Sequence, residues 1–96
     1  MGRKFPTGPI GQYFDQIANL KRFRDKQRKN FELLTEREIE VLTLLAEGYN
    51  NPRMAKELDI SRNTVQNHRA SIREKLNIKT QVEFVKFALA FDLIQF

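Results

Sequence analysis

The sequence predicts an all-α fold, in which one longer amphipathic helix precedes a unit of four shorter helices. Apolar residues recur at spacings of three and four through most of the chain, the period of helices that bury one face. Two Thr-x-x-Glu patterns and a serine stand where three of these segments begin, and such residues cap helix N-termini. With 96 residues the chain has room for one small core, so we expect an extension over residues 1–33 and one domain over residues 34–96.

The N-terminal helix is expected between residue 10 and about residue 30, after the breaker-rich residues 5–9. A basic run over residues 21–29 follows its apolar stripe. We interpret this run as a solvated linker, with non-specific DNA contact and a dimer-forming helix as the alternatives. The stripe is too short to hold a helix alone, so it must pack on its own domain, a missing sensor domain or, as we favour, a second copy. The stripe consists of Ile10, Tyr13, Phe14, Ile17 and Leu20.

The next helix is expected to begin after Thr35. Thr35 and Glu38 have the spacing of a capping box, in which each side chain satisfies a backbone N–H that the new helix leaves unpaired. Gly48 suits the left-handed conformation that commonly ends a helix, so we expect the end just before it. The inner face has the helical spacing and consists of Ile39, Leu42, Leu45 and Ala46.

Asn51 and Pro52 predict a third helix, because an asparagine caps it and a proline suits its first position. The inward residues of this short helix are Met54, Ala55 and Leu58. A brief turn then leads to Ser61, which caps a fourth helix running to about Leu76. Two helices joined by so short a turn form a helix-turn-helix.

The fourth helix divides into three faces when each residue is advanced by about 100 degrees. The face that must pack against the domain consists of Val65, His68, Ile72 and Leu76. The opposite face consists of Asn63, Asn67, Ala70 and Glu74, with Gln66 at its edge. A basic flank between these two faces consists of Arg62, Arg69 and Arg73.

This distribution of side chains suits the major groove of DNA. Amides pair with base edges, a small residue allows contact with a thymine methyl, and arginines reach phosphates along the groove wall. An ordinary solvated helix would have a similar apolar face, but the capped and tightly spaced helix before it favours DNA. The sequence therefore predicts that residues 62–76 form a recognition helix.

The last helix is expected to begin at a second capping box, formed by Thr80 and Glu83. We assign the core-facing side to Val82, Val85 and Leu89. Three further apolar residues are then surplus to the core, and exposed apolar surface of this kind usually marks an interface. We therefore expect a self-association face formed by Phe84, Phe87 and Phe91.

Five segments between Leu34 and Leu76 resemble, in order, the signatures of the LuxR-type (GerE-like) C-terminal helix-turn-helix domain of bacterial transcription regulators. The resemblance extends from residue 34 to about residue 96, two thirds of the chain. Such an ordered series is more specific than any one motif. The segments are Leu34-Thr35-Glu36-Arg37-Glu38, Ala46-Glu47-Gly48-Tyr49-Asn50-Asn51, Met54-Ala55-Lys56-Glu57-Leu58, Ser61-Arg62-Asn63-Thr64-Val65 with His68, and Lys75-Leu76.

The resemblance implies four helices, of which the third enters the major groove and the last mediates dimerisation. It places base contacts on Gln66, Asn67 and Ala70. It places phosphate contacts on Asn63, Thr64, Arg69 and Arg73. Pro52 and Arg53 depart from the lysine and glutamate usual in relatives, so a backbone contact there is not carried over. The receiver or ligand-binding domain of relatives has no counterpart, so we expect either a C-terminal fragment or a short stand-alone regulator.

Composition limits the other functions. The net charge of +5 lies entirely in residues 1–33, because residues 34–96 carry nine charges of each sign. There is no cysteine and no apolar run of membrane-spanning length, so we expect a soluble, cytoplasmic protein. His68 stands alone on an inward face without a second ligand, and acidic residues near Thr35 are explained by the helix dipole. We therefore expect no enzyme activity, no metal and no cofactor.

The leading hypothesis is sequence-specific binding to double-stranded DNA as a homodimer, through the C-terminal helix and also the N-terminal helix, to regulate transcription. Two alternatives are retained. One is a protein-interaction module that keeps the fold without DNA binding, against which the three flank arginines argue. The other is a promoter-binding domain of a sigma factor, which acts with RNA polymerase.

Overall fold

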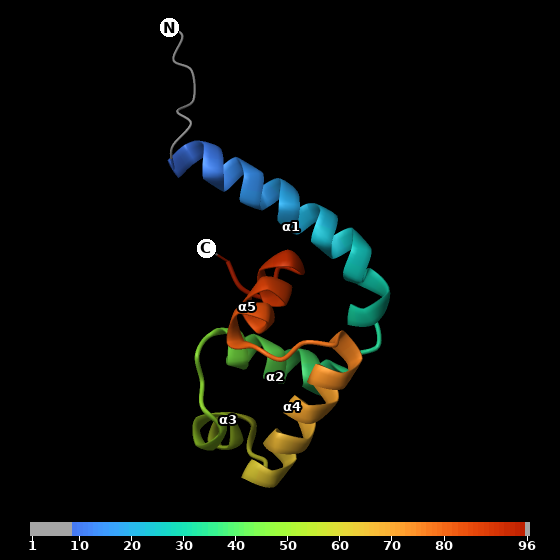
Figure 1. Ribbon diagram of the computed structural model, residues 1–96. Coiled ribbons are helices and arrows are strands. Elements are labelled where there is room, and N and C mark those ends of the chain that lie inside the picture. Colours follow the sequence, from blue (N-terminus) through green and yellow to red (C-terminus); the bar gives the residue numbers. More distant parts are fainter. Residues whose placement is uncertain (1–8, 96) are drawn as a thin grey trace, which may run out of the picture.

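The computed structural model describes the backbone of residues 9–95 and the side chains of residues 19–95. Within that part of the chain the fold is all-α, as predicted, with no strand. One long helix lies across a group of four shorter helices (Figure 1). The helices are α1 (Pro9–Phe31), α2 (Glu36–Ala46), α3 (Asn51–Leu58), α4 (Arg62–Leu76) and α5 (Gln81–Ala90).

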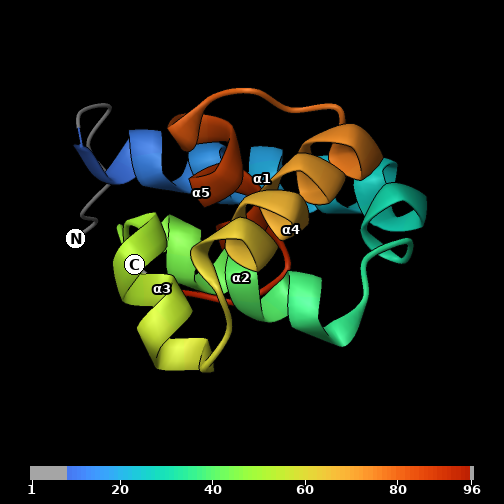
Figure 2. The same ribbon diagram turned by 90° about the horizontal axis from the view of Figure 1, so that it is seen from below.

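The core is enclosed by α2, α3, α4 and α5. Helix α2 contacts both α4 and α5. Helix α3 packs against α4, the next helix in the chain. Figure 2 shows α4 lying across this group, with α1 on the far side of α5. The largest fully buried side chains come from all four helices and are Val41, Leu42, Leu45, Met54, Val65, Ile72, Phe84 and Phe87.

The predicted caps of α2, α4 and α5 are confirmed. The backbone N–H of Glu38 donates to Thr35 Oγ1 at 3.1 Å, and the Thr35 N–H donates back to Glu38 Oε1 at 2.9 Å. Thr80 and Glu83 form the same reciprocal pair before α5. Ser61 caps α4, because its Oγ accepts the Thr64 N–H at 3.0 Å.

The cap predicted for α3 was one residue too late. Asn50 is the cap, since its Oδ1 accepts the backbone N–H of Arg53 at 3.0 Å, and Asn51 is already the first helical residue. Pro52 therefore occupies the second position, which equally needs no N–H donor. The turn that follows is confirmed, with Asp59 in the left-handed conformation at φ 55°. The side chain of Asn51 is left free for other contacts.

The face assigned to the core of α5 was wrong. Phe84 and Phe87 are 1% and 2% exposed, whereas Val82 is 75% exposed. The reason is that α5 is covered from two sides, by α2 and by α1. The Phe23 ring meets the Phe87 ring edge-on at 4.8 Å between centroids, and Phe31 stacks on Phe91 at 4.0 Å. The phenylalanines that we expected to form a self-association face therefore pack within the chain.

The inner face of α2 was partly misassigned as well. Leu42 and Leu45 are buried as expected, and half-buried Ile39 packs against the core, but Ala46 is only half-buried. Val41, which was not assigned to this face, is fully buried, because α2 packs against both α4 and α5 and so needs a wider apolar face.

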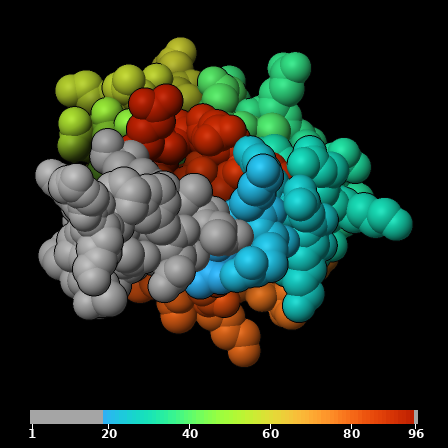
Figure 3. Space-filling model, turned by 90° about the horizontal axis from the view of Figure 1, so that it is seen from above, coloured from blue at the N-terminus to red at the C-terminus, as the bar shows by residue number. Residues whose placement is uncertain are grey.

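The second half of α1 packs on the four-helix group rather than standing free in solvent. Phe23 is the main apolar contact, and the ammonium of Lys86 lies 4.5 Å from its ring centroid. Arg24 pairs with Asp92 at 3.3 Å between Nη1 and Oδ2. Figure 3 shows described side chains of α1 beside those of the end of the chain.

The first four residues of the predicted α1 stripe lie outside the described side chains, so its packing on a second copy stays a prediction. These residues are Ile10, Tyr13, Phe14 and Ile17. Across the described residues, no helix is both long enough and apolar enough to cross a bilayer.

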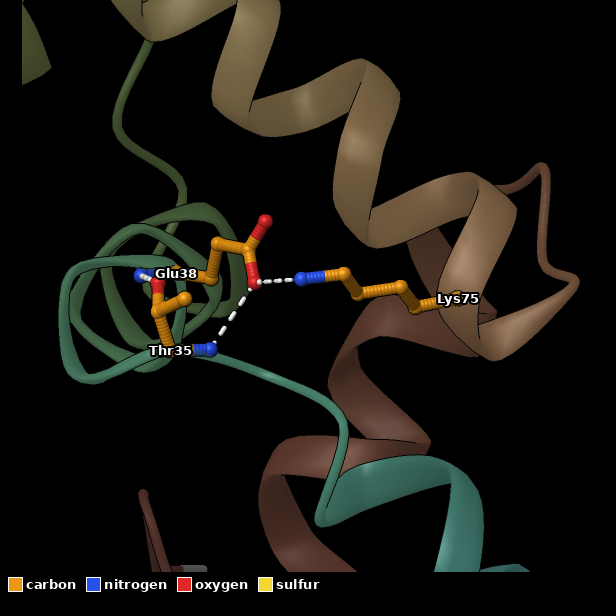
Figure 4. Close-up of polar contacts among 3 residues, drawn as sticks. All are labelled: Thr35, Glu38 and Lys75. Atoms are coloured by element: carbon orange, nitrogen blue, oxygen red, sulfur yellow. Dashed lines mark hydrogen bonds and ion pairs between the residues drawn. The ribbon is translucent and has the colours of Figure 1, made fainter.

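A partly buried ion pair joins the start of α2 to the last turn of α4 (Figure 4). Lys75 Nζ lies 2.7 Å from Glu38 Oε1, and the Glu38 side chain is only 5% exposed. Burial alone would raise the pKa of Glu38, but hydrogen bonds from Lys75, Ser71 and the Thr35 backbone lower it to about 2. The carboxylate that caps α2 therefore also fixes the position of α4.

Candidate nucleic-acid interface

The outward face predicted for α4 is exposed along its whole length. Val65, Ile72 and Leu76 are buried beneath it, and His68 is half-buried. The helix is thus oriented as its apolar spacing predicted, with its polar side turned away from the core. The exposed residues of this face are Asn63, Gln66, Asn67, Ala70 and Glu74.

Thr64 differs from its neighbours on the first turn of α4. It is half-buried, and its Oγ1 lies 2.8 Å from Ser61 Oγ, with either hydroxyl able to donate. The Thr64 backbone N–H is taken by the same serine. The hydroxyl therefore strengthens the cap and orients the start of the helix.

The flank arginines split into one exposed and two half-buried side chains. Arg62 is exposed, whereas Arg69 and Arg73 are half-buried, and the Nε of each has no hydrogen-bond partner among the described residues. Burial, followed by the charge of Arg73, lowers the pKa of Arg69 below its ordinary value. Two guanidinium groups thus lie close together, and an external anion would relieve their repulsion.

Arg73 also packs on the core. Its guanidinium carbon lies 5.9 Å from the centroid of the Phe84 ring, so the stem of this side chain is held between α4 and α5. Neither Arg69 nor Arg73 forms an ion pair within the described part of the chain.

Asn51 connects α3 to α4. Arg69 Nη1 donates to Asn51 Oδ1 at 2.6 Å, and Asn51 Nδ2 donates to Gln66 Oε1 at 2.7 Å. The sequence interpretation treated Asn51 only as a cap and missed this bridge. No local pattern could have indicated it, because the partners are 15 and 18 residues away along the chain.

Arg53, at the position that departs from the family pattern, lies on the exposed side of α3. Its guanidinium carbon is 4.0 Å from the centroid of the Tyr49 ring, a cation–π contact. The contact fixes a positive charge near the N-terminus of α3, one helix away from the α4 face. Arg53 is thus an exposed cation at a position for which the resemblance supplied no DNA contact.

Comparison with known proteins identifies the family. Residues 32–88 match the family model described as bacterial regulatory proteins, luxR family. The chain is 42% identical over 93 residues to the oxygen regulatory protein NreC of Staphylococcus carnosus (strain TM300), covering 97% of the chain and 42% of the relative. It is 41% identical over 93 residues to NreC of Staphylococcus aureus (strain JH9), with the same coverage.

A third relative, also an NreC protein, matches a shorter stretch of the chain. The chain is 42% identical over 66 residues to NreC of Staphylococcus epidermidis (strain RP62A), covering 69% of the chain and 30% of that relative. The chain thus spans about two fifths or less of the length of these curated relatives. Together with the helix-turn-helix of α3 and α4, these matches show that the chain belongs to the luxR family of bacterial regulatory proteins and carries its DNA-binding, transcription-regulating domain.

Proposed function

We propose that this chain binds specific double-stranded DNA sequences by inserting α4 into the major groove. The observation that carries the proposal is the exposed row of small and amide side chains on a helix whose opposite face packs into the core through buried Val65, Ile72 and Leu76. Base contacts are assigned to Gln66, Asn67 and Ala70. Phosphate contacts are assigned to Arg62, Asn63, Thr64, Arg69 and Arg73.

The positions of the charged residues, and not the net charge, support the insertion of α4 into the major groove. Residues 34–96 are neutral overall, so this domain attracts phosphate only through the way its charges are distributed, and the basic flank of α4 supplies cations for it. Arg69 and Arg73 have no carboxylate partner among the described residues, and each keeps N–H donors for phosphate oxygens. Cations held without an internal partner are what a phosphate-binding surface requires.

The DNA-bound form is proposed to be a homodimer, with one recognition helix in each half-site. The dimer contact on α5 cannot be formed by Phe84 and Phe87, because both are buried within the chain. The opposite side of α5 offers Val82, exposed, together with half-buried Val85 and Leu89 at helical spacing. Sedimentation of Val82→Glu, compared with unchanged protein at the same concentrations, would test this face, since a buried charge should abolish association.

The chain is proposed to act without catalysis, in the bacterial cytoplasm, where DNA and RNA polymerase are found. Contact with RNA polymerase is part of this proposal, since family members regulate transcription. Co-purification with polymerase core in the presence and absence of bound DNA would distinguish recruitment at a promoter from a permanent polymerase subunit.

The experiment that tests the proposal is an anisotropy titration of the full chain with labelled duplexes over a range of salt concentrations. Random duplex should bind with a steep salt dependence, because each neutralised phosphate releases counterions. Selection from a random duplex library should then yield a consensus with regular half-site spacing. A chain that shows no salt-dependent binding to any duplex would be an interaction module, and the proposal would be wrong.

A further inference from the structure

The bridge between Asn51 and α4 fixes which way two amide groups face. Amide oxygen and nitrogen atoms are otherwise interchangeable, and only their partners decide the orientation. Arg69 decides it here, because a guanidinium group can donate hydrogen bonds but cannot accept them. The atom of Asn51 that lies 2.6 Å from Arg69 Nη1 must therefore be the oxygen Oδ1.

The orientation of the Asn51 amide in turn fixes the orientation of the Gln66 amide. With Oδ1 on Arg69, the group that Asn51 presents to Gln66 is its NH2, which can only donate. The partner atom at 2.7 Å must then be Gln66 Oε1. The other end of the amide, Nε2, makes no hydrogen bond within the described residues, and Gln66 is exposed. One arginine on the flank of α4 thus sets the direction of an amide on its outward face.

This orientation changes what Gln66 offers to DNA. The bidentate pair of glutamine with adenine needs the amide oxygen and nitrogen turned to the base together. In this structure the oxygen is held against α3, so the groove is offered two N–H donors. In the major groove guanine presents two neighbouring acceptors, N7 and O6, and thymine presents the acceptor O4. Adenine presents the acceptor N7 beside the donor N6–H2, which repels an N–H donor, and cytosine presents only the donor N4–H2.

We propose that Asn51 is a positioning residue for base recognition, which makes Gln66 a hydrogen-bond donor and so selects guanine or thymine over adenine or cytosine at one position of the site. This inference rests on the proposed function, because it requires α4 to enter the major groove. Arg69 would then have two roles. Its guanidinium contacts phosphate, and because it can only donate, it also sets the direction of the hydrogen bonds from Arg69 to Asn51 and from Asn51 to Gln66.

The test uses one substitution to reverse the direction of the hydrogen bond between residue 51 and Gln66. In Asn51→Asp both side-chain oxygens accept, so the aspartate takes hydrogen bonds from Arg69 and from Gln66 Nε2. Gln66 then turns Oε1 toward the groove and pairs with donor groups on adenine or cytosine. A carboxylate at the first position of α3 also suits the helix dipole, so the fold is retained. The matched control is Asn50→Asp, which adds the same charge one residue earlier and, as aspartate, still caps α3.

The measurement is selection from a random duplex library, followed by competition with duplexes that carry each of the four bases at the selected positions. Gln66→Ala identifies the position that this side chain contacts, because preference there is lost. In the unchanged chain guanine or thymine should be favoured at that position by about tenfold, within the range of one good base contact. Asn51→Asp should favour adenine or cytosine there, while Asn50→Asp should weaken all duplexes alike and leave the preference unchanged.

A second readout does not depend on DNA. In the free protein, NMR should show that the Asn51 side-chain amide protons exchange with water more slowly than those of exposed Asn67, and Gln66→Ala should abolish the difference. In Asn51→Asp the slow protons should be those of Gln66. An adenine preference in the unchanged chain, or the same preference in Asn51→Asp and Asn50→Asp, would overturn the inference. Slow exchange in a protein that binds no duplex would overturn the proposed function instead.

Discussion

The first half of α4 contacts the rest of the domain differently from the second half. Between Arg62 and Arg69 only Val65 is fully buried, and the polar tertiary contact is the bridge to Asn51. The second half is held by buried Ile72 and Leu76 and by the Lys75–Glu38 ion pair. One end of the helix is therefore fixed to the core while the other presents side chains to a ligand. Substitutions along α4 should accordingly separate stability from DNA binding.

The largest effect is expected at Ile72, which has no exposed surface. Ile72→Ala should lower the free energy of unfolding by about 2–5 kcal/mol, because it removes buried methyl groups and leaves a cavity. Urea unfolding followed by circular dichroism measures the change. Ala substitution of exposed Asn67 is the matched control and should stay within about 0.5 kcal/mol. Equal losses at the two positions would mean that the halves of α4 are equally anchored.

The next largest effect is expected from Glu38, which should make the free energy of unfolding depend on pH. A pKa of about 2 in the fold, against its ordinary 4.5, corresponds to about 3 kcal/mol of stability. Because the pKa is lower in the folded chain, this stability is fully present above pH 4.5 and is lost as the pH falls toward 2. Urea midpoints measured between pH 7 and pH 2 should show the loss for the unchanged chain.

Glu38→Gln isolates this effect, since glutamine keeps the capping box but has no charge to pair with Lys75. Its stability should change less over the same pH interval. Glu83, in the equivalent position of the second capping box, provides the comparison. Among the residues whose side chains are described, its carboxylate is bonded only to Lys79 and Thr80 nearby and has no partner on another helix. A pH profile of Glu38→Gln that parallels the unchanged chain would contradict the assigned role of the ion pair.

The two capping boxes also show what could be predicted from the sequence. Both boxes, the cap at Ser61 and the turn at Asp59 depend on residues within four positions of one another, so local patterns were sufficient to find them. The Glu38–Lys75 pair joins residues 37 positions apart and could not be found in this way. The orientation of α4 was predicted because its apolar face is narrow and faces one core.

The prediction for α5 failed for a related reason. This helix is apolar on two sides, so periodicity alone could not decide which side packs inward. The choice depends on α1, whose Phe23 lies within a basic run and was not assigned to any apolar face. The Asn51 bridge was likewise hidden, because it needs the crossing of α3 and α4 to bring its three side chains together.

A smaller effect, confined to DNA affinity, is expected at Asn67. This amide is exposed at the centre of the outward face, and the structure shows no hydrogen bond from its side chain within the described residues. It can therefore pair bidentately with adenine, and Asn67→Ala should cost about 1–3 kcal/mol on the preferred site. Affinity for random duplex and its salt dependence should be unchanged. A uniform loss on all duplexes would show that Asn67 contacts the DNA backbone.

The smallest effects should separate the two ends of the basic flank. Arg62→Ala and Arg73→Ala should each reduce the slope of log affinity against log salt by about 0.9, since each removes one phosphate contact. Only Arg73→Ala should also lower stability, by about 0.5–1 kcal/mol, because its guanidinium lies over the Phe84 ring. Anisotropy titrations at several salt concentrations and urea unfolding of the same samples measure both quantities. If Arg62→Ala lowered stability while Arg73→Ala left it unchanged, the first turns of α4 would be the anchored end and the helix would approach DNA by its other half.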